Sequence, residues 1–238
     1  IKPNVRHAID CFVALCVKCY HCANTLIKSK YPMKITVFGA SGQTGKQVVE
    51  QCLEAGHEVI AAMRNIPSTS TKKGLTYIQS DVLEDKSLSF LATEQADVVV
   101  IALGTKQLMK NNVRSLGTEN IINALKANSN STPTLILLSA AGIGDSKHQI
   151  GWGSRLIAYT LLAHTMREHE TQEQAVINSG FDYHILRAVG LTNKSEIDYQ
   201  LINEGKLPNL QVSRTAVATC IAELINTNKR KNTITCIC

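Results

Sequence analysis

The nine residues VFGASGQTG, at positions 37–45, combine residue types that suit the binding of a phosphate group. An apolar run precedes them and a segment with helical spacing follows, so the turn opens a helix whose first amides carry partial positive charge. Gly39 permits a tight turn, Gly42 lets a diphosphate approach the backbone, and Gly45 lets the helix pack closely on the sheet. Three polar side chains add hydrogen-bond donors along the turn: Ser41, Gln43 and Thr44. The stretch predicts dinucleotide binding, and the alternative is a purely structural turn.

The end of the second predicted strand indicates which dinucleotide is bound. Enzymes that use NAD place a carboxylate there for the ribose 2′-hydroxyl, whereas a 2′-phosphate requires a cation. This chain has Arg64 directly after Ala62 and Met63, with no carboxylate. A guanidinium can fork onto a phosphate and stack on adenine. We therefore expect NADP (NADPH) as the cofactor in preference to NAD, with a solvated surface arginine as the alternative.

These residues belong to a regular alternation of apolar strands and amphipathic helices. Continuous apolar runs predict buried parallel strands over 34–40, 58–64, 75–82, 96–104, 133–142, 182–190 and 232–238. Helical spacing predicts helices over 46–56, 117–128, 170–180 and 214–226. The alternation predicts a single α/β domain over residues 33–238, a doubly wound Rossmann-type parallel sheet with helices on both faces. We expect small inserts near 143–155 and 192–212.

The glycine spacing, G-x-x-G-x-x-G, is similar to that of the short-chain dehydrogenase/reductase superfamily. Residues 33–238 resemble its atypical NAD(P)-binding members, the NmrA-like group, and within it the biliverdin reductase B or flavin reductase branch. Four further segments carry the resemblance: ALGT at 102–105, GTENIINALKA at 117–127, LLSA at 137–140 and NSGFDYHILR at 178–187. Similar reductases carry a second basic residue where this chain has Ser68, so the resemblance implies a modest preference for NADP.

The resemblance also implies roles for residues at the ends of the later strands. Asp81 would accept a hydrogen bond from the adenine amino group, and Val82 would pack on the ring. Backbone would pass under the cofactor at three residues: Leu103, Gly104 and Thr105. Ser139 would hydrogen-bond the nicotinamide carboxamide or the substrate, and His169 would be the second candidate catalytic residue. The alternatives are a strand-end cap for Ser139 and a solvated histidine for His169.

The acid–base pair of typical short-chain dehydrogenases is missing from the sequence. Those enzymes use Tyr-x-x-x-Lys, in which the lysine lowers the pKa of the tyrosine. None of the six tyrosines has a lysine four residues later; Tyr159 is followed at that spacing by Ala163, and Tyr183 by Arg187. An easily reduced planar acceptor, such as a flavin, a quinone or a biliverdin-like tetrapyrrole, needs no such pair. We expect an NADPH-dependent reductase of such an acceptor, and the alternative is a non-catalytic NmrA-like sensor that binds NADP and acts through a protein partner.

The composition argues against other classes of partner. The net charge of +6 is concentrated in residues 1–32, which carry +4, and aromatic residues make up only 5%. The rest of the chain is too weakly basic to predict nucleic-acid binding. No apolar run reaches the roughly 20 residues of a membrane-spanning helix, and no convincing export signal is present. We expect a cytoplasmic monomer or weak homodimer whose partner is a small-molecule acceptor.

Residues 1–32 differ in character from the rest. They contain four cysteines in the spacing C-x4-C-x2-C-x2-C: Cys11, Cys16, Cys19 and Cys22. Such spacing can hold zinc, but no second cysteine pair follows, so we interpret it as a chance cluster and expect no metal site. Met33 directly precedes the first strand. We therefore expect residues 1–32 to be a leader or extension outside the fold.

Overall fold

The computed structural model describes residues 31–68, 72–104, 112–128, 132–151, 160, 162–227 and 232–238. The four clustered cysteines and Thr105 lie outside these ranges. Within them, no group of three or more His, Cys, Asp or Glu side chains is arranged to hold a metal ion.

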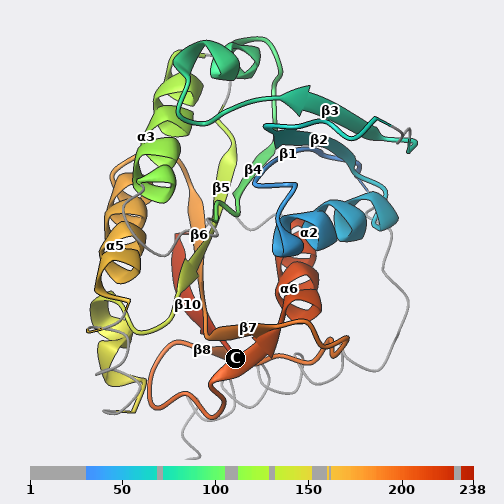
Figure 1. The fold of residues 1–238 in the computed structure, drawn as a ribbon. Coiled ribbons are helices and arrows are strands. Elements are labelled where there is room, and N and C mark those ends of the chain that lie inside the picture. The colour runs from blue at the N-terminus through green and yellow to red at the C-terminus, as the bar shows by residue number, and fades with distance from the viewer. Residues whose placement is uncertain are drawn as a thin grey trace, which may run out of the picture.

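A sheet of eight strands forms the centre of the part of the chain that the structure describes (Figure 1). The strands are β1 (Lys34–Phe38), β2 (Glu58–Met63), β3 (Leu75–Gln79), β4 (Val98–Ile101), β5 (Thr134–Ala140), β6 (Tyr183–Ala188), β8 (Leu201–Ile202) and β10 (Thr233–Ile237). Their order is β3-β2-β1-β4-β5-β6-β10-β8, and every pair is parallel except β8 with β10.

The strand order reverses between β1 and β4, which are neighbours in the sheet. The chain builds outward from β1 to β3 and then starts again at β4 on the other side of β1. This arrangement confirms the predicted doubly wound fold. In such sheets ligands bind outside the carboxyl ends of the strands at the reversal.

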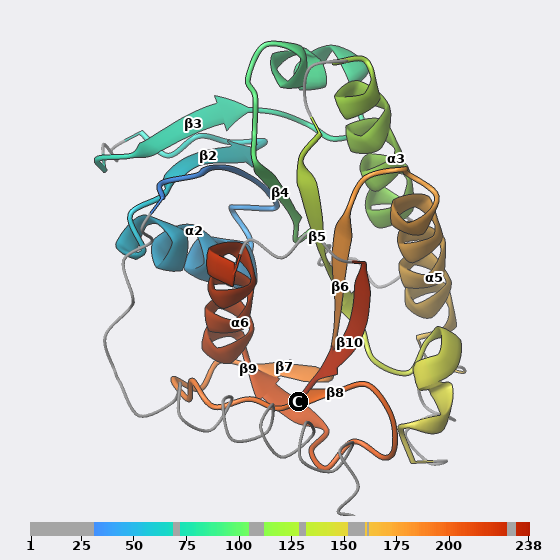
Figure 2. The ribbon, with the colours of Figure 1, turned by 180° about the vertical axis from the view of Figure 1, so that it is seen from behind.

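Helices cover both faces of the sheet (Figures 1 and 2). One face carries α2 (Gln43–Glu54) and α6 (Arg214–Thr227), and the other carries α3 (Val113–Lys126) and α5 (Ala163–Ile177). Two 3-10 helices, η1 (Asp85–Ala92) and η2 (Gly144–His148), follow β3 and β5. A small second sheet pairs β7 (Gly190–Thr192) with β9 (Gln211–Ser213) around the predicted insert near 192–212. None of the helices in the described ranges has the length and apolar character needed to span a bilayer.

Three helices begin earlier than their apolar pattern predicts. The spacing predicts starts at residues 46, 117 and 170, whereas α2, α3 and α5 begin at Gln43, Val113 and Ala163. The added turns are rich in polar residues, so they carry little of the apolar periodicity on which the prediction depends.

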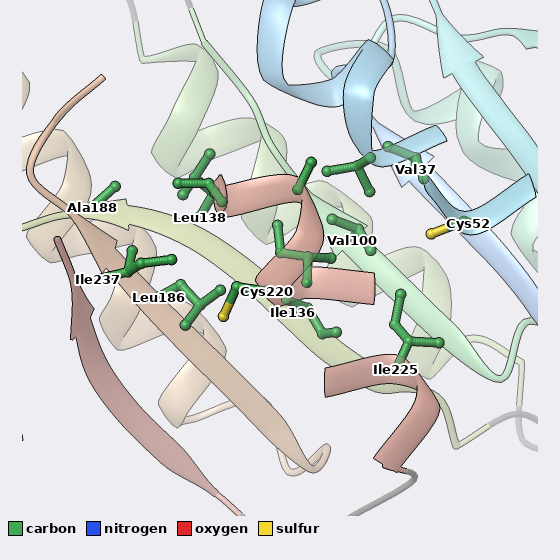
Figure 3. Close-up of a cluster of buried hydrophobic side chains, with 14 of the residues drawn as sticks. Val37, Cys52, Val100, Ile136, Leu138, Leu186, Ala188, Cys220, Ile225 and Ile237 are labelled. Atoms are coloured by element: carbon green, nitrogen blue, oxygen red, sulfur yellow. The ribbon is translucent and has the colours of Figure 1, made fainter. Parts of the chain in front are cut away.

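The core between the sheet and helices α2 and α6 is apolar (Figure 3). Val37, Val100 and Ile136 point from neighbouring strands toward the buried thiols of Cys52 and Cys220. Burial raises the pKa of both thiols to about 12. These cysteines therefore act as small apolar side chains that pack α2, through Cys52, and α6, through Cys220, against the sheet.

The opposite core lies under α3 and α5, and it changes character toward the carboxyl edge of the sheet. Along β5, Leu135 and Leu137 are fully buried on this face. Because side chains alternate along a strand, Ser139 points to the same face two residues later. A polar position therefore ends the apolar row at the edge where a ligand is expected.

Candidate functional site

Gly39 and Gly45 are required by the backbone of the turn itself. Gly39 has a φ of +80°, and a Cβ there would lie 2.3 Å from the carbonyl oxygen of Ala102. A Cβ on Gly45 would lie 2.2 Å from the carbonyl oxygen of Gly39. Any side chain at either position would collide with main chain. These two glycines join β1, the segment after β4 and the first turn of α2.

Gly42 differs from the other two glycines because the fold does not require it. Its φ of −73° suits any residue, it is exposed, and a Cβ there would meet only the Gly39 oxygen, at 3.1 Å. The missing side chain leaves the turn open to solvent. A side chain at position 42 would begin to fill this open space. Such a space is expected where a diphosphate approaches the backbone.

The first amides of α2 are available to a ligand in that space. The amide of Gly42 donates to the Gly39 oxygen at 2.9 Å, and the first helical bond runs from Lys46 N to the Gly42 oxygen at 3.0 Å. The N–H groups of residues 43–45 therefore precede the helical ladder and have no acceptor within it. Gly42 supplies no side-chain cap, and the first turn holds no acidic residue. The arrangement suits an anion. Around it, Ser41 and Gln43 are exposed, whereas Thr44 is buried.

The end of β2 and the segment after β3 adjoin the turn. Arg64 follows β2 directly and is exposed. After β3, Asp81 is half-buried, and its Oδ1 accepts a hydrogen bond from Leu83 N at 3.0 Å. Val82 is buried, and its carbonyl oxygen accepts a hydrogen bond from Asn120 at 2.9 Å. The backbone at the predicted adenine contacts is thus fixed by hydrogen bonds to its neighbours.

Gly117, inside α3, supports this region in a way that the sequence pattern did not reveal. A Cβ on Gly117 would lie 2.6 Å from Cγ2 of Val82 and 3.1 Å from Cδ1 of Leu103. The glycine therefore lets α3 pack directly on two predicted cofactor-binding residues. A glycine inside a helical pattern was the available signal. Gly104 follows Leu103 and is exposed.

Ser139 lies at the carboxyl end of β5, next to Arg187 of β6 in the sheet register. Its side chain is buried, with the residue 4% exposed, yet its Oγ has no hydrogen-bond partner among the residues that the structure describes. A buried hydroxyl without a partner costs about 1–3 kcal/mol, so each one calls for a partner such as a ligand or a bound water. Ser139 is therefore available to a ligand group at this edge.

His169 is buried on α5, so its interpretation as a solvated surface residue is wrong. Burial and, to a lesser degree, the charge of Arg114 together lower the pKa of His169 to about 3, against a hydrogen bond with Gln172 that raises it. Within the described part of the chain, its Nδ1 has no hydrogen-bond partner. The imidazole is neutral at physiological pH, so it can donate or accept a hydrogen bond but does not act as a general acid.

One turn further along α5, Glu173 forms a buried ion pair with Arg187. The residues are 3% and 5% exposed, and Nε and Nη2 of Arg187 donate to the two carboxylate oxygens at 3.0 and 2.8 Å. Arg187 also pairs with the exposed Asp145 of η2. Burial alone would lower the pKa of Arg187, but its hydrogen bonds to Glu173 and Asp145 outweigh this and raise it. The pair fixes α5 and η2 to the end of β6, beside Ser139.

A polar interface holds α5 to α3. Oγ of Ser115 donates to Oε1 of Glu168 at 2.9 Å, and Nε2 of Gln172 donates to Oγ1 of Thr118 at 2.8 Å. Both Glu168 and Gln172 are buried. The sequence pattern gave no sign of these contacts, because charged and amide residues on a helix are usually solvated.

Two groups of predicted residues therefore lie along the carboxyl edge of the sheet. The glycine turn, Arg64, Asp81 and Val82 follow β1, β2 and β3. Ser139 is the penultimate residue of β5, and His169 lies on α5. Helix α5 packs over β5 and β6 (Figures 1 and 2). An elongated ligand crossing the reversal point would contact both groups.

Comparison with known families agrees with this geometry. The sequence profile of a family described as NAD(P)H-binding matches residues 39–228. The chain is 28% identical over 217 residues to an uncharacterized chloroplastic protein of Arabidopsis thaliana, covering 85% of this chain and 74% of that protein. It is 27% identical over 97 residues to the photosystem II assembly factor Ycf39 of Synechocystis, covering 40% and 29% of the two chains.

Solved structures share the fold. ChuY, an anaerobilin reductase of Escherichia coli O157:H7, superposes with a TM-score of 0.72 at 22% identity, covering 86% of this chain and 96% of that one. A short-chain dehydrogenase/reductase of Veillonella parvula in complex with NADP has a TM-score of 0.72 at 20% identity, covering 87% and 94%. The oxidoreductase YlbE of Lactococcus lactis has a TM-score of 0.71 at 19% identity, covering 86% and 90%.

Proposed function

The chain belongs to the NAD(P)H-binding family, and from this premise we propose that it is an NADPH-dependent reductase of a planar conjugated acceptor. The acceptor class comprises flavins, quinones and biliverdin-like tetrapyrroles. The observation that carries the proposal is the buried, unpartnered Oγ of Ser139 at the carboxyl end of β5. It lies at the edge where the nicotinamide end of a dinucleotide held by the glycine turn would arrive.

The residues of the turn fit the rest of such a cofactor. The amides of residues 43–45 would bind the diphosphate, and Arg64 would bind the 2′-phosphate. Asp81 keeps carboxylate capacity beyond its bond to Leu83 N, so it can accept from the adenine amino group. When bound, NADPH supplies the hydride.

At the nicotinamide end of the site, Ser139 and His169 would orient the nicotinamide and the acceptor by hydrogen bonds and would not serve as proton donors for the reaction. Ser139 can donate its hydroxyl proton in a hydrogen bond to the carboxamide or to the acceptor. His169 is neutral and offers one further hydrogen-bonding nitrogen, Nδ1. With no Tyr-x-x-x-Lys pair in the sequence, an acceptor that takes its proton from solvent fits these residues best. The similarity to a protein named as an anaerobilin reductase supports the same acceptor class.

The compartment and assembly are part of the proposal. The cysteines within the described ranges, Cys52, Cys220, Cys236 and Cys238, are free and buried. Free thiols suit a reducing compartment, and we propose the cytosol and a monomer or weak homodimer.

Turnover tests the proposed function. The full chain is mixed with NADPH and, separately, FMN, a soluble quinone or biliverdin, and absorbance at the nicotinamide band is followed. We expect oxidation with at least one acceptor, and a loss of about 10- to 100-fold in kcat for Ser139→Ala. Thr36→Val is the matched control, because Thr36 of β1 is also buried with an unpartnered hydroxyl but precedes the carboxyl edge. Tight NADPH binding without oxidation of any acceptor would instead support the sensor function.

A further inference from the structure

A cavity of about 380 Å³ lies between α2, β2 and β3. Its walls are mainly apolar toward the last turn of α2, where Leu53 and Leu75 line it. Lys46 lines it from the first turn of α2, Ser41 from the glycine turn that precedes α2, and Asn65 from the segment after β2. Because these three residues lie at the carboxyl edge of the sheet, the cavity has a polar end beside the candidate cofactor site.

This polar end adjoins the position expected for the ribose. Asn65 follows Arg64 directly, and both are exposed. Ser41 immediately precedes the open glycine, Gly42, and is also exposed. A ribose held at the end of β2 would therefore direct its 2′ substituent between the Ser41 hydroxyl and the residues after the strand.

The basic residues in and beside the cavity lining differ in whether they form an ion pair. Lys72 pairs with Glu50 at 3.9 Å, so these two lining charges compensate each other. Lys46 is exposed and, within the described residues, forms no ion pair. Arg64 likewise forms none in those ranges. Lys46 therefore lines the polar end without an ion pair in those ranges. Arg64 is not a lining residue, but it directly precedes Asn65, which is one.

We propose that Lys46 is the second cation of a 2′-phosphate site, acting together with Arg64. The inference rests on the proposed binding of NADPH and adds a residue that determines its specificity. It also replaces the basic residue that similar reductases carry where this chain has Ser68. The preference for NADPH over NADH then depends on the first turns of α2 as well as on β2.

Substitution of Lys46→Met tests the proposal, because it removes the charge and keeps an unbranched side chain on the helix. Dissociation constants are measured for NADPH, NADH, 2′,5′-ADP and ADP by isothermal titration with the full chain at two salt concentrations. We expect the dissociation constants of NADPH and 2′,5′-ADP to rise about tenfold, and those of NADH and ADP to stay within about twofold. The effect should shrink at high salt.

Lys72→Met is the matched control, since Lys72 lines the same cavity but is paired with Glu50. It should leave all four constants nearly unchanged. An unchanged NADPH constant in Lys46→Met, or an equal loss for NADH, would overturn the role of Lys46. The wild-type titrations separate this from the proposed function, because wild-type protein that binds neither dinucleotide would refute both.

Discussion

Replacement of the middle glycine, Gly42→Val, should abolish coenzyme binding while leaving the sheet folded. The backbone at Gly42 has an ordinary φ, and a Cβ would sit 3.1 Å from the Gly39 oxygen, so that oxygen must move by only a few tenths of an ångström. Valine is also a poor N-cap, and together these effects should cost about 1–2 kcal/mol of unfolding free energy. For a chain of this size that corresponds to a fall in Tm of about 2–8 °C.

The matched substitution Gly45→Ala should have the opposite effect and disrupt the fold itself. Its Cβ would lie 2.2 Å from the oxygen and 2.8 Å from the carbon of the Gly39 carbonyl, and both are main-chain atoms that cannot rotate away. Either α2 or the end of β1 must shift, which should cost about 3 kcal/mol or more. Loss of fold rather than loss of binding is therefore the expected phenotype.

Thermal melting followed by circular dichroism, with and without NADPH, distinguishes the two variants. Saturating NADPH at about 100 times its Kd should stabilise the wild-type protein by about 2.7 kcal/mol, or about 5–10 °C. Gly42→Val should melt cooperatively about 2–8 °C below the wild-type protein and show no ligand shift. A wild-type ligand shift in Gly42→Val would refute the assignment of this turn as the diphosphate site.

Three further substitutions test other parts of the site. Arg64→Ala should raise the Kd of NADPH at least tenfold more than that of NADH in titration calorimetry; equal effects would mean that Arg64 does not contact the 2′-phosphate. His169 has a folded pKa near 3, below the 6.5 of the unfolded chain, so the unfolded state takes up a proton first and stability falls from about pH 6.5 toward pH 3. His169→Gln should reduce the slope of that fall in urea titrations by up to about 1.4 kcal/mol per pH unit, and an unchanged slope would contradict the burial of a neutral imidazole. Glu173→Gln should destabilise the fold by about 3–5 kcal/mol in urea, because it leaves the buried Arg187 without its carboxylate; a loss below 1 kcal/mol would show that Asp145 alone compensates the cation.

The parts of the fold that the sequence predicts are those with local signals. Most of the parallel strands are short apolar runs, and three glycines indicate the turn after β1. Short range patterns also place Ser139 at the end of β5 and Arg64 at the end of β2, as the structure confirms. Whether these residues contact a cofactor stays a prediction.

What the sequence does not predict depends on partners far apart in the chain. Gln172 and Glu173 look like solvated helix residues, yet they are buried by Thr118 and Arg187, 54 and 14 residues away. Helix α5 has little apolar periodicity because much of its buried face is polar: Glu168, Gln172 and Glu173 are buried and bind their neighbours by hydrogen bonds. No local sequence pattern indicates a role for Lys46, because the cavity that it lines forms only where β2 and β3 pair.

The division of labour among the three glycines has an evolutionary consequence. Gly39 and Gly45 would be retained by purifying selection on folding alone, even in a descendant that had lost its coenzyme. Only Gly42 is free to drift once the ligand is gone. Relatives with this fold that have lost coenzyme binding should therefore carry a residue other than glycine at the position of Gly42. The glycines at the positions of Gly39 and Gly45 should be retained in them.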